Sequence, residues 1–410
     1  MNVKQPMLSV DAALERILSA AAPIPESEIV STLDADGRIL AEALVSQLNV
    51  PPEDNAAMDG YAVRAADCAQ GDVQHRISQR IPAGSSPLPL EAGTAARIFT
   101  GASIPPGADA VVMQELCEPH GADGVIIHRA PKAGESIRRI GEDIKAGSVL
   151  LPSGTRMRAQ ETGLAASVGL NTVSVRRRVR VAVLFTGSEL VMPGQPLKPG
   201  MIYNSNYFTL QNLLKRLGCR VTDCGTVADS LDATIESLRL ASSEHDLIVT
   251  SGGVSVGEED HVKPAVQAQG HLDVWQIAIK PGKPLAFGQI KRADSAGSAF
   301  FVGLPGNPVS SFITFLLFVR PFILRLQGVE DVAPRFLLAR ADFAWPKAEE
   351  RNHFLRARIN SSGGLDLFPN QGSGVLTSTV WGDGLVDKPP GHTIKEGDMV
   401  RFVPFSSVMD

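Results

Sequence analysis

Apolar positions recur along the chain at two spacings, which predict a mixture of helices and strands. Apolar residues three and four positions apart predict helices over residues 9–21, 33–42, 159–168, 204–217, 231–240 and 310–326. Short apolar runs predict strands over residues 181–185, 220–227, 247–250, 274–279 and 299–302. From residue 180 onward these strands alternate with helices, which is typical of a three-layer α/β unit with a largely parallel sheet.

Two regions outside this unit have a different, β-type pattern. Residues 51–150 are rich in glycine and proline, with short apolar runs at 95–99, 110–113 and 124–128. Beyond residue 328 the runs at 336–343, 354–359 and 400–403 predict a small C-terminal β-barrel. We therefore expect an α/β and β multidomain protein in which the first β-rich region is an insertion. The expected domains are a mixed N-terminal domain (1–50 plus 151–178), the inserted β domain (51–150), the α/β domain (179–328) and the barrel (329–410).

Two of the predicted helices carry recognisable end signals. Ser9 is a plausible N-cap for the first helix. Its apolar face consists of Val10, Ala13, Leu14, Ile17 and Leu18. The helix over 204–217 ends at Gly218, the expected C-cap. Its expected apolar positions are Phe208, Leu213, Leu214 and Leu217.

Composition and charge favour a soluble globular protein. The net charge of −5 argues against a nucleic-acid-binding surface. The one basic run, residues 176–180, indicates a solvated face between domains. The apolar run 312–319 is too short to span a membrane and indicates a buried helix. Charged residues within 11–16 interrupt any signal-peptide core, so we expect a cytoplasmic protein without membrane contact.

The four cysteines give no sign of a metal site or a disulfide. Cys68, Cys117, Cys219 and Cys224 form no CxxC pair. A zinc site at the two closest of them would need two further ligands nearby. We expect all four to be reduced.

The glycine-rich turn over residues 250–260 is the strongest single indication of a site. It follows a buried strand and precedes a predicted helix start near Asp260. Gly252, Gly253 and Gly257 allow a backbone to approach a ligand closely, and N–H groups at a helix start favour phosphate. The acidic residues 258–260 would repel that phosphate unless a hard cation such as Mg²⁺ lay between them. A plain turn with a solvated acidic helix start is the open alternative.

Other polar loops follow the remaining strands of the α/β unit. Such loops meet at one edge of an open α/β sheet, where ligands bind. Glu189, Asp229 and Asp260 suit a divalent cation, and Lys280 and Lys283, held by a proline-containing loop, suit an anion. Together they predict an anionic substrate whose phosphate is bridged by a metal. Surface ion pairs on polar loops remain the alternative.

Eight sequence blocks resemble the MoeA family, the molybdopterin molybdenumtransferases, to which the gephyrin E domain also belongs. The blocks occur in family order at residues 55–62, 97–102, 106–113, 141–143, 186–189, 251–257, 280–284 and 303–308. The resemblance implies a MogA-like α/β domain, an L-shaped four-domain subunit and a homodimer. It also implies that adenylylated molybdopterin and molybdate are converted to molybdenum cofactor with release of AMP. Mg²⁺ is the implied cofactor, with Zn²⁺ as an alternative.

Family positions carried over residue by residue give the expected site. The catalytic set is Asp59, Thr100, Asp143, Glu189, Asp229 and Asp260, of which Glu189, Asp229 and Asp260 would bind the metal. The substrate-binding set is Ser251, Gly252, Gly253, Ser255, Gly257, Lys280, Lys283, Pro305, Arg356 and Ser373. Arg356 and Ser373 match the family's molybdate-binding arginine and serine. In the family, the matches of Asp59, Thr100 and Asp143 face the α/β site of the neighbouring subunit.

Two other functions share features with this resemblance. The related molybdopterin adenylyltransferase has the α/β domain and its glycine-rich loop, but it is a single domain. A scaffold role of the gephyrin type would need no catalysis. Molybdopterin adenylyltransferase and other proteins of cofactor biosynthesis are the expected partners besides the second subunit.

Overall fold

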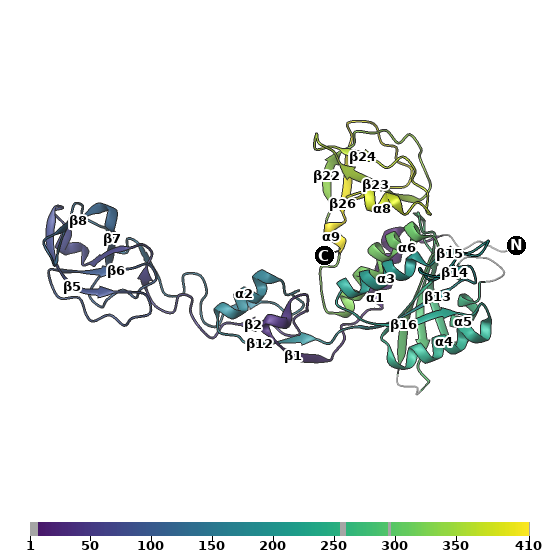
Figure 1. Cartoon of the computed structure of the whole chain (residues 1–410), viewed down its shortest axis with the longest axis horizontal. Coiled ribbons are helices and arrows are strands. Elements are labelled where there is room, and N and C mark those ends of the chain that lie inside the picture. The colour runs from purple at the N-terminus through teal and green to yellow at the C-terminus, as the bar shows by residue number, and fades with distance from the viewer. Residues whose placement is uncertain (1–6, 255–259, 294–296, 410) are drawn as a thin grey trace.

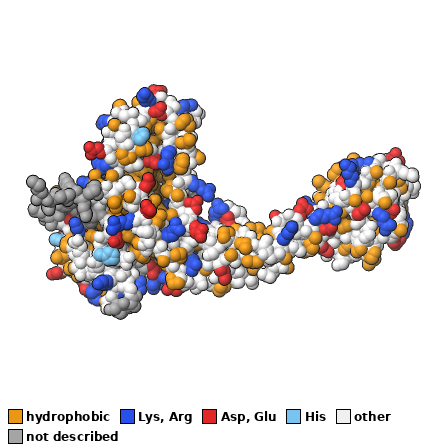
Figure 2. Space-filling model, turned by 180° about the vertical axis from the view of Figure 1, so that it is seen from behind, with side chains coloured by type: hydrophobic (Ala, Val, Ile, Leu, Met, Phe, Trp, Pro, Cys, Tyr) orange, Lys and Arg blue, Asp and Glu red, His pale blue; other side chains and the backbone are white. Residues whose placement is uncertain are grey.

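The chain folds into an L-shaped molecule with a long arm (Figure 1). The computed structural model describes residues 7–254, 260–293 and 297–409. An α/β unit lies at one end, a C-terminal β-unit stands above it, and an arm carries a second β-unit to the far end (Figure 1). Hydrophobic, basic and acidic side chains are interspersed over the face seen in Figure 2, without a large area of one charge.

The α/β unit is built on a six-stranded sheet. Its strands, in spatial order, are β16 (Arg220–Val227), β13 (Arg180–Thr186), β17 (Leu247–Ser251), β21 (Ser298–Leu304), β20 (Pro284–Lys291) and β18 (Gly270–Gln276). The first four are parallel, which confirms the largely parallel sheet. The sequence pattern missed β20, which is antiparallel to both of its neighbours. Because β20 reverses the direction twice, β18 ends at the same edge of the sheet as the parallel strands.

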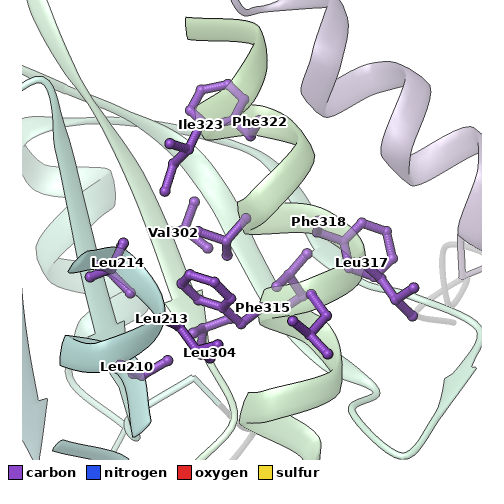
Figure 3. Packing of buried hydrophobic residues seen from close by; sticks show 14 of the residues in the cluster. Leu210, Leu213, Leu214, Val302, Leu304, Phe315, Leu317, Phe318, Phe322 and Ile323 are labelled. Atoms are coloured by element: carbon purple, nitrogen blue, oxygen red, sulfur yellow. The ribbon is translucent and has the colours of Figure 1, made fainter. Parts of the chain in front are cut away.

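Helices cover both faces of this sheet. They are α1 (Val10–Ser19), α3 (Ser205–Arg216), α4 (Leu231–Glu244), α5 (Val262–Gln269), α6 (Pro308–Thr314), η4 (Phe315–Val319) and α7 (Arg320–Leu326). Successive side chains of a strand point to opposite faces. Accordingly, Val183 of β13 packs with α3 and α6–α7, and Leu184 packs with α4 and α5. Figure 3 shows Phe315, Leu304 and Leu213 meeting between the sheet and the helices.

The helix over 308–326 is continuous and forms the centre of the larger core. Its middle is a π-helical turn, η4, before Pro321. Proline has no N–H to donate to the preceding turn, which accounts for the widened turn. By length and composition the helix could cross a membrane, but 94% of its most apolar window is buried within the protein. It packs like the core helix of a soluble protein, as the apolar run 312–319 indicated.

The N-terminal helix α1 belongs to the α/β core and not to the arm. Ser9 caps it by accepting a hydrogen bond from the N–H of Ala12, as predicted. Its buried residues Ala13 and Ile17 lie in the same cluster as Phe318. The apolar stripe of α1 is thus buried against α7 and η4, although α1 precedes the arm in sequence. The domain boundaries remain predictions.

Two local expectations were also wrong. Residues 33–42 form no helix; the 3₁₀ turn η1 (Thr32–Ala35) ends before Gly37, whose φ of +72° suits glycine. Ile39 and Leu40 then make β-bridges to the returning chain. In α3 the capping residue is Leu217 and Gly218 follows it, while Phe208 is 45% exposed because the sheet lies on the opposite side of the helix.

The arm consists of the outgoing and returning chain paired side by side. Its elements are β1 (Ser27–Ser31) with β12 (Thr172–Arg176), β2 (Leu44–Val45) with β11 (Val149–Leu151), β3 (Asn55–Ala56) with β10 (Ile137–Arg138), and the predicted helix α2 (Ala159–Ser167). The basic run at its base lies between domains, but it is not simply solvated. Arg177 and Arg180 are half-buried and pair with Asp246 at 2.8 and 3.2 Å. Burial of these arginines with a carboxylate fixes the arm to the sheet.

The inserted β-unit is a six-stranded sheet that confirms the predicted runs. Its order is β7 (Ala110–Met113), β4 (Gly60–Val63), β6 (Thr94–Ile98), β5 (Val73–Ile81), β9 (Gly124–Ile127) and β8 (Cys117–His120), with short turns η2 (Ala65–Cys68) and η3 (Gln114–Leu116). Two small apolar clusters cover its two faces. All four cysteines of the chain are free, as expected.

The C-terminal unit is the predicted small barrel. Its strands are β19 (Ile279–Lys280), β23 (Asn352–Ile359), β25 (Gly384–Lys388), β26 (Met399–Pro404) and β22 (Leu337–Arg340), with β24 (Leu365–Leu367) on β23 and helices α8 (Thr377–Trp381) and α9 (Ser406–Met409). A bridge from Ala341 to Leu365 closes the sheet. The strand expected over 274–279 is divided, because Ile279 and Lys280 pair with β23 instead. The α/β unit thereby contributes a strand to the barrel.

Candidate functional site

A cavity of about 500 Å³ lies at the predicted edge of the α/β sheet. The carboxyl ends of β13, β17 and β21 form its floor, with a small ribbon of β14 (Leu190–Val191) and β15 (Ile202–Tyr203) at its side. Its lining includes the expected site residues Glu189, Asp229, Ser251, Gly252, Gly253, Asp260 and Pro305. The fold therefore brings seven of the predicted residues to one place.

The glycines of the turn after β17 are required by their backbone and their neighbours. Gly252 and Gly253 have φ of +97° and +65°. A Cβ on Gly252 would lie 2.5 Å from the carbonyl oxygen of Thr186, and one on Gly253 would lie 2.7 Å from Val262 Cγ2. Any side chain here would collide with the wall of the cavity, so the backbone itself forms the surface. Ser255 and Gly257 lie outside the described residues.

Buried polar atoms at the floor have no hydrogen-bond partner among the described residues. They are Thr186 Oγ1, Asn204 Nδ2 and Asn206 Oδ1. Asn206 Nδ2 donates to Ser251 Oγ at 2.9 Å and to Gly306 O at 2.8 Å, which fixes the amide. Buried polar groups without partners are costly, so their presence beside a cavity indicates a polar ligand.

These floor residues were missed by sequence reasoning. Asn204 is the N-cap of α3 and Asn206 is buried in the first turn of the same helix. An asparagine at a helix start is ordinarily a cap, so Asn204 gave no functional signal. The signal that was available was Asn206, a polar residue two positions after the cap and in the first turn of the helix.

The three predicted metal ligands share this cavity but do not form a closed metal site. The carboxylate of Glu189 lies directly against Gly187. A Cβ atom built on Gly187 would be 2.5 Å from Glu189 Oε2. Among the described residues no three His, Cys, Asp or Glu side chains are close enough to hold one ion together. The metal-binding role of the three carboxylates therefore remains a prediction. The donors fit Mg²⁺, which uses one or two carboxylates plus substrate phosphate, and the described lining holds none of the His or Cys ligands that are common at Zn²⁺ sites.

The two lysines lie next to the cavity and not in it. Lys280 donates to Glu349 Oε1 at 2.6 Å, across the junction with the barrel. Lys283 is exposed. Neither side chain lines the cavity. The strand β19 directs Lys280 toward the barrel, which sequence periodicity could not reveal.

The Glu349 carboxylate accepts several hydrogen bonds at this junction between the α/β unit and the barrel. His353 Nδ1 and Trp345 Nε1 donate to its Oε2 at 2.7 and 3.2 Å, and Lys388 Nζ lies 3.7 Å away. Burial works to raise the pKa of the Glu349 carboxyl, but the bonds from Lys280 and His353 outweigh it and lower that pKa to about 2. Burial lowers the pKa of His353 to about 4, against the attraction of Glu349. No sequence motif indicated this cluster, because the fold brings Lys280 to Glu349.

Arg356 and Ser373 have different positions relative to the cavity. Ser373 lies on a loop that docks on the start of α6, where its carbonyl accepts from Val309 N at 3.0 Å. Arg356 is fully buried and donates to Ser378 Oγ and to the carbonyls of Phe354 and Gly372. Burial lowers the pKa of its guanidinium to about 10. In this conformation the guanidinium of Arg356 supports the loop of Ser373, and its N–H groups are not available to a ligand.

The remaining expected residues lie on the arm side of the molecule. Asp59 accepts hydrogen bonds from Thr100 N at 2.8 Å and from Thr100 Oγ1 at 2.7 Å. These bonds, the backbone one first, lower the pKa of the Asp59 carboxyl. Asp143 is exposed near the base of the β-unit. The arm holds this β-unit far from the cavity of the same chain (Figure 1).

Comparisons with known proteins agree over the whole chain. Three family models match it: the MoeA N-terminal region (domain I and II) at residues 8–169, the probable molybdopterin binding domain at 182–325, and the MoeA C-terminal region (domain IV) at 339–405. A curated relative, molybdopterin molybdenumtransferase of Haemophilus influenzae, is 37% identical over 98% of this chain and 100% of its own.

Solved structures give the same result. Two structures of the molybdopterin biosynthesis MoeA protein from Pyrococcus horikoshii are similar to this chain. One has a TM-score of 0.79 at 33% identity, covering 98% of this chain and 99% of that one. The other has a TM-score of 0.84 at 28% identity, covering 97% and 100%. From its cavity, its domain order and these full-length similarities, the chain belongs to the MoeA family.

Proposed function

We propose that this enzyme inserts molybdate into adenylylated molybdopterin and releases AMP, which yields molybdenum cofactor. The observation that carries the proposal is the cavity at the sheet edge, which is lined by the glycine turn and by three acidic residues. Full-length identity to a relative named molybdopterin molybdenumtransferase supports this transferase over a single-domain adenylyltransferase. No feature of the chain favours a scaffold without catalysis.

The cavity suits the phosphate end of the substrate. The turn of Gly252 and Gly253 allows phosphate oxygens to approach the backbone closely. Asn206 and Thr186 offer polar atoms at the floor. These groups would orient the substrate before any bond is broken.

One or two of the lining carboxylates of Asp229, Asp260 and Glu189, together with substrate phosphate, are the proposed ligands of Mg²⁺ in this cavity. When bound, the ion would neutralise phosphate charge and orient the leaving AMP group. The carboxylates themselves would hold it at the correct edge of the cavity. The metal assignment would fail if calorimetry detected no Mg²⁺ binding in the presence of AMP.

Molybdate must also be held close to a substrate that already carries phosphate. Two anions about 4 Å apart in a partly buried site repel each other by several kcal/mol. Fixed positive charge is therefore needed nearby, and Lys283, Lys280 and Ser373 at the rim are the proposed molybdate-side residues. Arg356 would contribute by supporting the loop of Ser373.

We further propose that the active protein is a homodimer in the cytoplasm. The exposed Asp59–Thr100 pair belongs to the inserted β-unit and Asp143 lies between β10 and β11, and the arm separates that β-unit from the α/β unit of its own chain (Figure 1). A second copy would bring its β-unit over this cavity and complete the site. The expected upstream partner is the enzyme that adenylylates molybdopterin.

The decisive experiment supplies purified protein with adenylylated molybdopterin, Mg²⁺ and molybdate. The expected result is AMP release that depends on molybdate, together with a product that activates an apo-molybdoenzyme. Asp229→Asn should retain the fold, by circular dichroism, and lose AMP release. Retention of the pterin without AMP release by the unaltered protein would overturn the proposal in favour of a scaffold. Sedimentation would test the dimer separately, and a fully active monomer would exclude the composite site.

A further inference from the structure

A second crevice, of about 650 Å³, lies where the arm, the helical layer and the C-terminal tail meet. It shares no lining residue with the cavity at the sheet edge. Figure 1 shows α9 beside the helical layer on the side from which the arm departs. Five arginines line this crevice: Arg156, Arg158, Arg216, Arg320 and Arg335. They come from four separate stretches of sequence, so only the fold brings them together.

Arg320 is the buried centre of this group. It is 8% exposed, and its two terminal nitrogens donate to the carbonyls of Val332 and Ser407 at 3.3 Å each. Its Nε has no hydrogen-bond partner in the described part of the chain. No carboxylate of the described residues forms an ion pair with it. Burial, and then the charge of Arg156, lowers the pKa of this guanidinium.

A buried cation without a counter-charge is unfavourable, and a second cation beside it makes it more so. Within the described residues, the side chain of Arg156 donates only to a backbone carbonyl, that of Arg216, at 3.3 Å. The positive charges of Arg156 and Arg320 are therefore not balanced by carboxylates among the described residues.

The acidic residues at this crevice do not cancel that charge. Glu161 is bound on both oxygens by Arg158, at 2.5 and 3.0 Å. Asp36 and Asp331 also line the crevice, but both are exposed to solvent and form no ion pair among the described residues. Ser406 adds a hydroxyl group to the lining, whereas the Ser407 hydroxyl already donates to the carbonyl of Pro404 at 2.8 Å. The chemistry offered is a set of guanidinium groups with one hydroxyl group, which matches a phosphate group.

We propose that this crevice binds a phosphate group, either as free phosphate or as part of a small phosphomonoester. The ligand would contact Arg156 of the arm, Arg320 of the helical layer and Arg335 at the start of the barrel. Because these segments belong to different parts of the fold, an anion here would hold the arm and the barrel in fixed positions. The site is independent of the proposed transferase reaction.

The test is calorimetric titration of the full-length protein with inorganic phosphate and, separately, with glycerol 3-phosphate. Chloride at matched ionic strength is the reference. We expect saturable binding that weakens at least tenfold in Arg156→Ala and in Arg335→Ala. Arg220→Ala, which removes an exposed arginine at the start of β16, is the matched control and should bind as the unaltered protein does. Tighter binding of glycerol 3-phosphate would identify a phosphomonoester as ligand, and binding of phosphate alone would identify the free ion.

Phosphate could also bind at the sheet-edge cavity, so a second comparison is needed. The double variant Lys280→Ala with Lys283→Ala should leave the crevice binding unchanged. Loss of phosphate binding in this variant, with normal binding in the arginine variants, would overturn the proposal. So would the absence of saturable binding of either probe. Neither result depends on AMP release, so this proposal and the proposed enzyme activity can fail separately.

Discussion

His353 should make the stability of this protein fall as the pH is lowered from 7 to 5. The side chain is 1% exposed and donates from Nδ1 to Glu349 at 2.7 Å. Burial lowers the pKa of its imidazole from 6.5 to about 4. Because the folded-state pKa is depressed, the stabilisation is complete above the unfolded value of 6.5. It is lost progressively as the pH falls toward about 4.

The magnitude follows from proton linkage between the folded and unfolded states. At pH 5 most unfolded chains would carry a proton on this imidazole, whereas few folded ones would. The free energy of unfolding should then be about 2 kcal/mol lower than at pH 7. Glu349 shifts in the same direction, but its contribution is lost only below its ordinary pKa of 4.5, outside this window.

Urea unfolding followed by tryptophan fluorescence measures this effect, since the Trp345 ring lies 5.3 Å from that of His353. In His353→Asn the amide can still donate to Glu349 but cannot titrate, so the pH dependence should flatten by about 2 kcal/mol. His120→Asn removes an exposed imidazole and is the control. Equal loss of stability between pH 7 and 5 in the unaltered protein and in His353→Asn would refute the reasoning.

Three further outcomes are expected. Asp59→Asn should keep its melting temperature and lose turnover; a parallel loss of both would assign Asp59 to a structural turn. Lys283→Ala should raise the molybdate concentration needed for half-maximal AMP release more than Lys280→Ala does, because Lys280 is already paired; the opposite order in a molybdate titration would contradict this. Phe315→Ala should lower the free energy of unfolding by about 3–5 kcal/mol in urea, whereas Phe208→Ala, at an exposed position of the same layer, should change it by less than about 1 kcal/mol.

The sequence alone determined the elements whose signals are local. Ser9 capped its helix as predicted because a cap depends only on the next three residues. The strands β13, β17 and β21 were recognisable because strands buried on both faces are continuous apolar runs. Since loops after parallel strands meet at one edge, the gathering of Glu189, Asp229 and the glycine turn followed from the order of the elements.

The tertiary structure alone decided where side chains point and which distant segments meet. The antiparallel strand β20 and the docking of α1 depend on contacts between segments far apart in sequence. Lys280 is bound to Glu349, and Arg356 is enclosed by its own barrel, because each carries a charge that its surroundings must satisfy. Residue type shows what a side chain can bind, but packing and the position of its partners decide what it does bind.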